Sequence, residues 1–256
     1  MTSLRNLGPL PDPDRFGGPH WLERTGGVMN RTECLRGLAI AGRQQIANLG
    51  QRVLPALRRA ALPDLPPVPD SKLVRLAEEA SLEQNATLLA HGYRSALFAR
   101  ALAALDGQQA DPELLHICGL LHDVGIMQAI AGEDFTLRSA AAARRCADCA
   151  GEPREVGDHL ADAIIVHTTV GVRPDRDGVL GAYTQYGAMV DLAGLRLKEL
   201  PRSFVAEVLR SHPRGPFKRE ILSRLALEAR SVPGGRFAFA TRVGFGYAVR
   251  AAPFTS

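Results

Sequence analysis

Two short polar stretches interrupt segments whose apolar residues recur at helical spacing. Both stretches carry side chains of types that can bind metals. His122 and Asp123 end an apolar run that begins at Leu114, and His91 stands in a similar apolar setting 31 residues earlier. Burying an unpaired imidazole or carboxylate costs several kcal/mol, so such residues are normally hydrogen-bonded, ion-paired or bound to a metal. Taken alone, the His-Asp pair is more typical of a helix C-terminus that pairs with a nearby arginine.

A third polar residue favours the metal interpretation. Asp191 lies inside the apolar segment 188–195, where aspartate has a poor helix propensity and no obvious local partner. Three helices would then supply two imidazoles and two carboxylates, a mixed donor set that suits a borderline divalent ion and can leave a position for water. We therefore predict one divalent metal, zinc in preference to iron or manganese, held by His91, His122, Asp123 and Asp191.

The elements that must position these residues are helices. The apolar spacing predicts them over 72–84, 86–106, 111–124, 136–149, 153–168, 178–198, 202–211 and 216–230. Asp111 and Pro112 frame the start of one helix, and Gly125 stands where a left-handed residue would end it. Strand signals are nearly absent before 236–243, where alternation indicates either one short strand or an ordered tail. The fold class is an all-α bundle.

The chain divides into three parts by composition. Residues 1–29 are rich in Pro and Gly and predict an irregular arm, and one extra N-terminal helix should follow the capping-box pair Asn30 and Glu33. We expect residues 1–60 to pack, as this arm and helix, on a main domain over 61–232. The remaining 233–256 form a C-terminal tail.

The spacing of these residues resembles the HD-domain superfamily of metal-dependent hydrolases, whose signature is an early His, a central His-Asp pair and a late Asp on separate helices. The flanking residues look most like its cyanamide-hydratase-like branch. The stretches that carry this likeness are Leu62-Pro-Asp64, His91-Gly-Tyr93-Arg94, Leu121-His-Asp-Val-Gly-Ile126, Ile165-Val-His167-Thr168-Thr169-Val-Gly171 and Phe217-Lys218-Arg219-Glu220. The resemblance implies an HD-domain helical bundle with the metal ligands named above.

The same resemblance implies a hydratase or hydrolase in which metal-bound hydroxide attacks an electrophilic carbon of a cyanamide- or nitrile-like substrate. Asp123 and His167 would carry protons during the reaction. By the same analogy, Tyr93, Arg94 and Thr168 would polarise the substrate. Lys218 would close the pocket or pair with a carboxylate.

Departures from the family pattern keep other functions open. HD-type phosphodiesterases usually place Lys after the glycine that follows the pair, and this chain has Ile126 there. A phosphohydrolase acting on a nucleotide or small phosphate ester, with Arg94 and Lys218 as its phosphate clamp, is the first alternative, and Ile126 argues mildly against it. A di-iron oxygenase is another, although no His lies between Asp123 and His159, which favours a single metal. The last alternative is a non-catalytic regulator that has the helical bundle without the activity.

Composition excludes several other classes. The 256 residues carry 31 basic and 27 acidic side chains, and 28 of the basic ones are arginines dispersed along the chain, which indicates solvated surface and disfavours a nucleic-acid partner. No apolar run is long enough to cross a bilayer, and four irregularly spaced cysteines suit a reducing compartment. We expect a cytoplasmic protein with a small-molecule substrate and no membrane partner. A homo-oligomer stays open.

Overall fold

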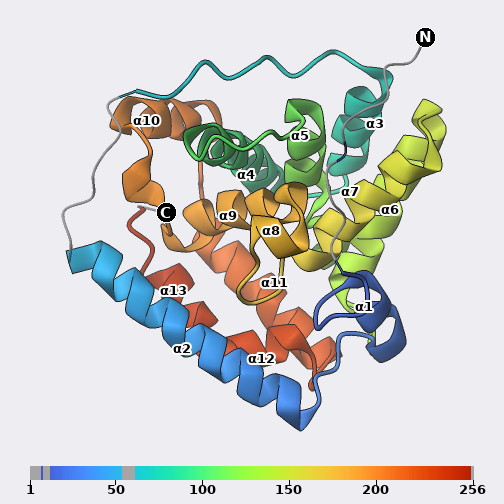
Figure 1. Cartoon of the computed structure of the whole chain (residues 1–256), viewed down its shortest axis with the longest axis vertical. Helices are drawn as coiled ribbons and strands as arrows, with labels where there is room; N and C mark the ends of the chain where they lie inside the picture. Colours follow the sequence, from blue (N-terminus) through green and yellow to red (C-terminus); the bar gives the residue numbers. More distant parts are fainter. Residues whose placement is uncertain (1–6, 8–11, 54–60, 255–256) are drawn as a thin grey trace.

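The structure, a computed structural model, describes residues 7, 12–53 and 61–254 (Figure 1). Within these residues the chain forms thirteen α-helices, two short 3-10 helices and no strand. The predicted all-α bundle is therefore confirmed. The helices are α1 (Pro19–Thr25), α2 (Arg31–Val53), α3 (Lys72–Ser81), α4 (Ala86–Leu105), α5 (Pro112–Leu121), η1 (Val124–Met127), α6 (Phe135–Ala150), α7 (Arg154–Val166), α8 (Pro174–Asp177), α9 (Val179–Ala193), η2 (Leu197–Glu199), α10 (Arg202–Ser211), α11 (Phe217–Ser231), α12 (Arg236–Arg242) and α13 (Phe245–Arg250).

Helices α4 and α9 form the centre of the bundle. Their backbones nearly touch, because a Cβ atom on Gly187 of α9 would stand 2.2 Å from the carbonyl oxygen of Ser95 on α4. Much of α4 is alanine, and its small side chains let α5 pack closely on another side. Buried residues such as Phe98 and Leu102 fill the surrounding core.

Helices α3, α6 and α7 cover α5, and their ends follow the sequence signals. The Asp111 carboxylate accepts hydrogen bonds from the first turn of α5, as predicted. The hairpin between α6 and α7 turns at Gly151, whose φ of +82° is the left-handed conformation that favours glycine. The bundle thus brings α4, α5, α7 and α9, which carry the predicted site residues, against one another.

The N-terminal part contains more regular structure than expected. The pair Asn30 and Glu33 makes both capping-box hydrogen bonds at the start of α2, at 2.7 and 2.9 Å, so this prediction is confirmed. The prediction of an irregular arm over residues 1–29 is wrong in one respect. Residues 19–25 form helix α1, which begins with a proline at its first position. Arg15 pairs with the buried Asp177, and this contact joins the arm to the short helix α8.

The C-terminal part forms helices, and the alternative of a strand over 236–243 is wrong. Residues 236–242 form α12, and α13 follows directly after. Phe239 of α12 packs against Gly37 of α2, while Phe237 on the other side of α12 faces a cavity inside the bundle. Because both faces of this short helix are covered, its apolar residues alternate as they would in a strand.

Across the described residues, the structure contains no helix with the length and apolar character needed to span a membrane.

Candidate metal centre

Two glycines bring the imidazoles of His91 and His122 together. His91 lies on α4, and His122 is the residue that ends α5. A Cβ atom on Gly119 of α5 would stand 2.5 Å from the Cβ atom of Ala96 on α4, and one on Gly92 would stand 3.1 Å from the Gly119 carbonyl oxygen. The two backbones are therefore in contact, and the Nε2 atoms of the two imidazoles lie 3.3 Å apart.

The outer nitrogens of both rings are already hydrogen-bonded. Nδ1 of His122 lies 2.8 Å from the carbonyl oxygen of Gly119, and Nδ1 of His91 lies 2.7 Å from a carboxylate oxygen of Asp191. A carbonyl and an ionised carboxylate only accept hydrogen bonds, so each Nδ1 atom carries the proton and donates it. When both rings are neutral, the two Nε2 atoms that face each other are consequently both lone-pair acceptors.

Asp123 adds further acceptors to this space. Its Oδ2 atom lies 3.4 Å from Nε2 of His122 and 3.7 Å from Nε2 of His91, and the ligand atoms of these three residues lie within 4.8 Å of one another. Lone pairs at these distances repel unless a cation or a proton lies between them. Two imidazole nitrogens and a carboxylate are a donor set that divalent zinc, iron or manganese binds. The residues present therefore fit a metal ion.

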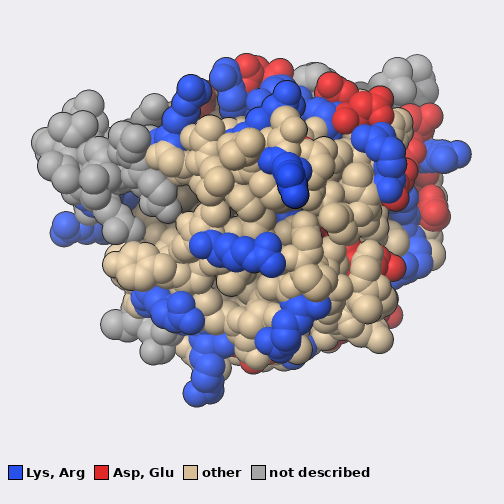
Figure 2. Space-filling view, turned by 90° about the horizontal axis from the view of Figure 1, so that it is seen from below, with Lys and Arg blue, Asp and Glu red and all other residues tan. Residues whose placement is uncertain are grey.

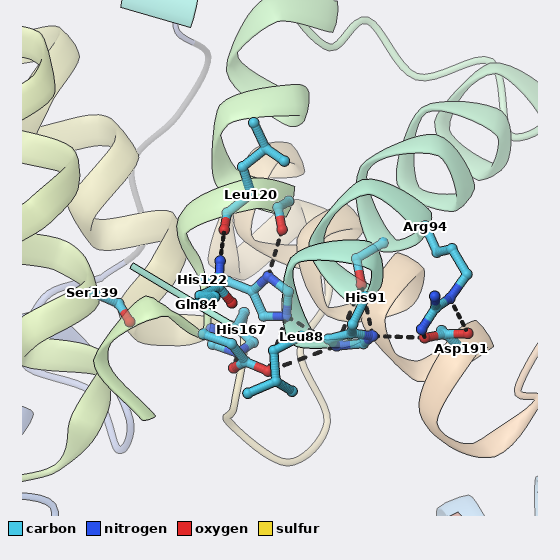
Figure 3. Close-up of polar contacts among 12 residues, drawn as sticks. Gln84, Leu88, His91, Arg94, Leu120, His122, Ser139, His167 and Asp191 are labelled. Atoms are coloured by element: carbon cyan, nitrogen blue, oxygen red, sulfur yellow. Dashed lines mark hydrogen bonds and ion pairs between the residues drawn. The ribbon is translucent and has the colours of Figure 1, made fainter. Parts of the chain in front are cut away.

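Asp191 lies beside this group but points its oxygens elsewhere (Figure 3). Arg94 donates to both carboxylate oxygens, at 2.9 and 2.8 Å, and Arg214 donates to Oδ1 and to the backbone carbonyl of Asp191. With the contact to His91, both oxygens are engaged. The structure thus does not bring Asp191 into the ligand group expected from the sequence, and it places this carboxylate where it orients the His91 ring.

The charge state of these residues follows from their partners. Burial alone would raise the pKa of Asp191, but its hydrogen bond with His91 and the charge of Arg94 hold this pKa well below its ordinary value. Burial lowers the pKa of His91, which is therefore neutral and able to bind a metal through Nε2. Burial, together with the nearby His122, lowers the pKa of His167 to about 3.

The turn after Asp123 is fixed by neighbours on α6. The backbone N–H of Gly125 donates to Oγ of Ser139 at 2.9 Å, and Arg138 donates to the Gly125 carbonyl at 3.1 Å. The predicted role of Gly125 as a left-handed cap is wrong, since it is not among the glycines with positive φ and α5 already ends at residue 121. Glycine is needed there because a Cβ atom would stand 2.1 Å from the Phe135 carbonyl oxygen.

A cavity of about 170 Å³ opens beside the group. His122 and Asp123 line one end, and the other walls are mostly apolar side chains of α9, α11, α12 and α13. Among the described residues, no Lys or Arg lines this cavity. Its polar lining comes from His122, Asp123, His167, Thr168, Thr169 and Gln185.

Two of the predicted reaction residues, besides Asp123, line this cavity. Nδ1 of His167 contacts the carbonyl oxygen of Ile164 and so donates to it, which leaves Nε2 as an acceptor 3.9 Å from Oδ1 of Asp123. The hydroxyl of Thr168 is buried and has no hydrogen-bond partner among the described residues. Both side chains are therefore placed to contact a ligand, and their roles remain predictions.

Three predicted substrate residues lie elsewhere. Arg94 is fully buried, and its remaining nitrogen donates to the carbonyls of His212 and Pro213, so it is a structural partner of Asp191 rather than a substrate ligand. The ammonium of Lys218 donates to the backbone carbonyls of residues 250, 252 and 254 and fixes the C-terminal segment. The ring of Tyr93 stacks on His212 at 4.7 Å, outside the cavity lining.

Two residues that support the site gave no sequence signal. Arg214 follows α10 in a loop, and nothing in its neighbours indicates that it will reach Asp191. Gln185 of α9 donates from Nε2 to the carbonyls of His167 and Thr169, at 2.5 and 2.7 Å, and thereby holds the chain around the cavity. Both act through backbone or loop contacts that span distant parts of the sequence.

The described residues thus combine a helical fold with a His-His-Asp group at the end of α5. In the family comparison, residues 71–159 are similar to the HDOD domain, which is related to the HD-domain superfamily and is often non-catalytic. The match covers 89 of the 256 residues and includes His91, His122 and Asp123. A comparison with curated proteins gave no match. The cyanamide-hydratase-like branch therefore remains a proposal.

Proposed function

We propose that this protein is a metal-dependent hydratase or hydrolase that acts on an electrophilic carbon of a small uncharged molecule, such as a cyanamide or a nitrile. One observation carries the proposal: the His-His-Asp cluster lies beside a mostly apolar cavity whose described lining contains no Lys or Arg. His91 and His122 would hold the ion through Nε2, and Asp123 through its carboxylate. The ion supplies Lewis acidity and lowers the pKa of a bound water.

The remaining residues would bind the substrate and move protons. Because the Nδ1–H bond of His167 to the Ile164 carbonyl fixes both the tautomer and the ring orientation, its Nε2 atom would accept a hydrogen bond from water or substrate. With the pKa of His167 lowered to about 3, this ring would hold a proton only in passing. The unpartnered hydroxyl of Thr168 donates to a heteroatom of the substrate. The apolar walls exclude bulk water, which strengthens both interactions.

The cavity lining disfavours the phosphohydrolase alternative. Phosphate binding relies on Arg, Lys or clustered backbone N–H groups, and the expected clamp residues Arg94 and Lys218 are engaged elsewhere in the described structure. The HDOD match supports a different second candidate, a regulator that binds a metal or small molecule in this cavity without chemistry. Measuring substrate turnover distinguishes the two candidates, because only the enzyme converts a substrate.

The test combines metal analysis with two substrates. We expect purified, metal-loaded protein to hold about one ion per chain and to convert cyanamide to urea while leaving p-nitrophenyl phosphate intact. Asp123→Asn should abolish turnover, and the matched control Asp148→Asn, which removes an exposed carboxylate on α6, should leave it unchanged. Turnover of the phosphate ester alone would contradict the proposal, and a metal-loaded protein that converts neither cyanamide nor nitriles would favour the regulator.

A further inference from the structure

Charge is distributed very unevenly along this chain. Residues 1–60 and 202–256 together carry 19 basic and 7 acidic side chains, whereas residues 61–201 carry 12 basic and 20 acidic ones. Within the described residues the fold brings parts of these two segments together, because α2 packs on α12 through Gly37 and Phe239, and α12 and α13 are adjacent. Arginines of α2, α12 and α13 that are far apart in the sequence therefore share one side of the molecule.

This side presents arginines without carboxylate partners. The basic face, as we call it, comprises the exposed arginines of α2, α12 and α13, and in the described structure none of them forms an ion pair. Figure 2 shows Lys and Arg standing among uncharged residues across the view, with Asp and Glu gathered toward its edge. The members of the basic face are Arg31, Arg36, Arg43, Arg242 and Arg250.

Several exposed arginines elsewhere are paired with carboxylates, whereas Arg145, Arg202, Arg219 and Arg230 form no ion pair within the described residues. Arg75 pairs with Asp70 at 2.5 Å, Arg173 with Asp175 at 2.8 Å, and Arg210 with Glu207 at 2.6 Å. These charges are neutralised by neighbours on their own surface. Among the residues that the structure describes, the positive charge of the basic face has no such neighbour, so an anionic partner is an available source of compensation.

Large apolar side chains stand among these arginines. Leu35 and Leu38 of α2 are 68% and 49% exposed, and Tyr247 of α13 is 74% exposed. The inner side of α2 is occupied by Gly37 and its neighbours, so the two leucines, three residues apart, share the outer side with Arg31. Arginines around exposed leucines on a helix are typical of a segment that lies on a membrane surface.

We propose that the basic face binds the surface of an anionic phospholipid bilayer, with the arginines against lipid phosphates and the two leucines in the boundary of the acyl chains. The leucines favour a bilayer over a nucleic acid, because a phosphodiester backbone gives apolar side chains nothing to bury against, and one exposed aromatic ring is a small stacking surface. This proposal differs from the sequence expectation of no membrane partner and does not depend on the metal centre.

The test is vesicle binding by the full chain. The protein should sediment with vesicles of equal parts phosphatidylcholine and phosphatidylglycerol at low salt, should release at high salt, and should not bind pure phosphatidylcholine. The charge reversal Arg31→Glu, Arg36→Glu, Arg242→Glu should lower affinity about 100-fold. Leu35→Ser with Leu38→Ser should lower it about tenfold at unchanged charge.

A control with the same net charge makes the result specific. Arg154→Glu, Arg202→Glu, Arg210→Glu changes three exposed arginines on α7 and α10 and should bind vesicles as the unchanged protein does. An equal loss in this control would overturn the proposal, because attraction would then depend on net charge alone. Tighter binding to a labelled oligonucleotide than to the anionic vesicles would also overturn it, in favour of nucleic acid.

A spectroscopic variant reports insertion directly. Trp21 is the single tryptophan and is buried, so Leu38→Trp adds an exposed fluorophore on the basic face against a constant background. Its emission should shift to the blue when anionic vesicles are added. Binding without this shift would contradict the placement of the leucines in the lipid.

Discussion

Asp123 and Asp191 lie on opposite sides of the same imidazole, yet their surroundings are opposite. Asp191 contacts Nδ1 of His91 and accepts hydrogen bonds from two guanidinium groups. Asp123 faces Nε2 of His91 at 3.7 Å, and its other close neighbours are the Nε2 atoms of His122 and His167. The two buried carboxylates therefore differ in use. The protein's own arginines neutralise the charge of Asp191, whereas the charge of Asp123 is left for a ligand.

The largest expected effect is on folding, at Asp191. Asp191→Ala leaves Arg94 and Arg214 buried without their carboxylate, and breaking such a network by removing one partner costs about 3–5 kcal/mol. Denaturant unfolding of metal-free protein should show this loss. Asp123→Ala under the same conditions should change the free energy of unfolding by less than about 1 kcal/mol, because no cation of the protein depends on it. Equal losses in the two variants would refute the comparison.

The next effect is on metal binding, and it should fall on the other carboxylate. Asp123→Ala removes one of three ligands and should lower metal affinity more than about 100-fold, a larger change than loss of an outer hydrogen-bond partner usually gives. Equilibrium dialysis measures this affinity directly. Added metal should raise the melting temperature of the unchanged protein and not that of the variant. Stoichiometric binding by Asp123→Ala and by His122→Ala would exclude this site.

Glu228 is a third buried carboxylate, which accepts one hydrogen bond and has only a distant ion-pair contact with a guanidinium group. Its Oε1 atom accepts from the Phe135 N–H, while Oε2 lies 3.6 Å from Arg138, too far for a hydrogen bond. Burial raises the pKa of Glu228 to about 7, so its folded form binds a proton more tightly than the unfolded chain does.

The sign of the pH effect follows directly. A raised carboxyl pKa contributes stability that is present below the unfolded pKa and is lost as pH rises from about 4.5 to about 7, by at most about 3 kcal/mol. Glu228→Gln should remove this contribution, so the difference in unfolding free energy between variant and unchanged protein should vary across that range. A constant difference would show that Glu228 is ionised throughout.

The smallest effect tests whether one guanidinium is enough for Asp191. Arg214 contacts Asp191 through one nitrogen, its Nε and Nη2 atoms have no hydrogen-bond partner, and its guanidinium lies 4.8 Å from the Phe217 ring centroid. Arg214→Lys keeps the charge and loses the ring contact, so it should cost about 1 kcal/mol. Arg94→Lys should cost more, because Arg94 makes the two-pronged contact. The reverse order would show that Arg214 is the main partner.

Much of the fold could be predicted because its signals are local. Apolar spacing located the helices of the bundle, and the capping residues Asn30 and Asp111 located two of their starts. The strand suggested for 236–243 failed because periodicity reports which faces are covered, and both faces of α12 are. The helix α1 was missed because seven residues rich in polar side chains give no apolar period.

The candidate site was less predictable because its contacts are distant in sequence. A resemblance could indicate His91, His122 and Asp123, which the structure brings together. It could not indicate whether Arg94 binds a ligand or a buried carboxylate, since the residue type suits both. That choice depends on where α9 and the loop after α10 place Asp191 and Arg214, and neither position has a local signal.

The backbone contact between α4 and α5 sets how the site can respond to ions of different radius. With Gly92 and Gly119 already touching the facing helix, the two helices cannot approach further, and adding even one methyl group there would force them apart. The distance between the two imidazoles therefore cannot be shortened by moving α4 and α5 closer together. Any adjustment to a smaller or larger ion must come from Asp123, the ligand that follows the C-cap residue His122 and precedes η1.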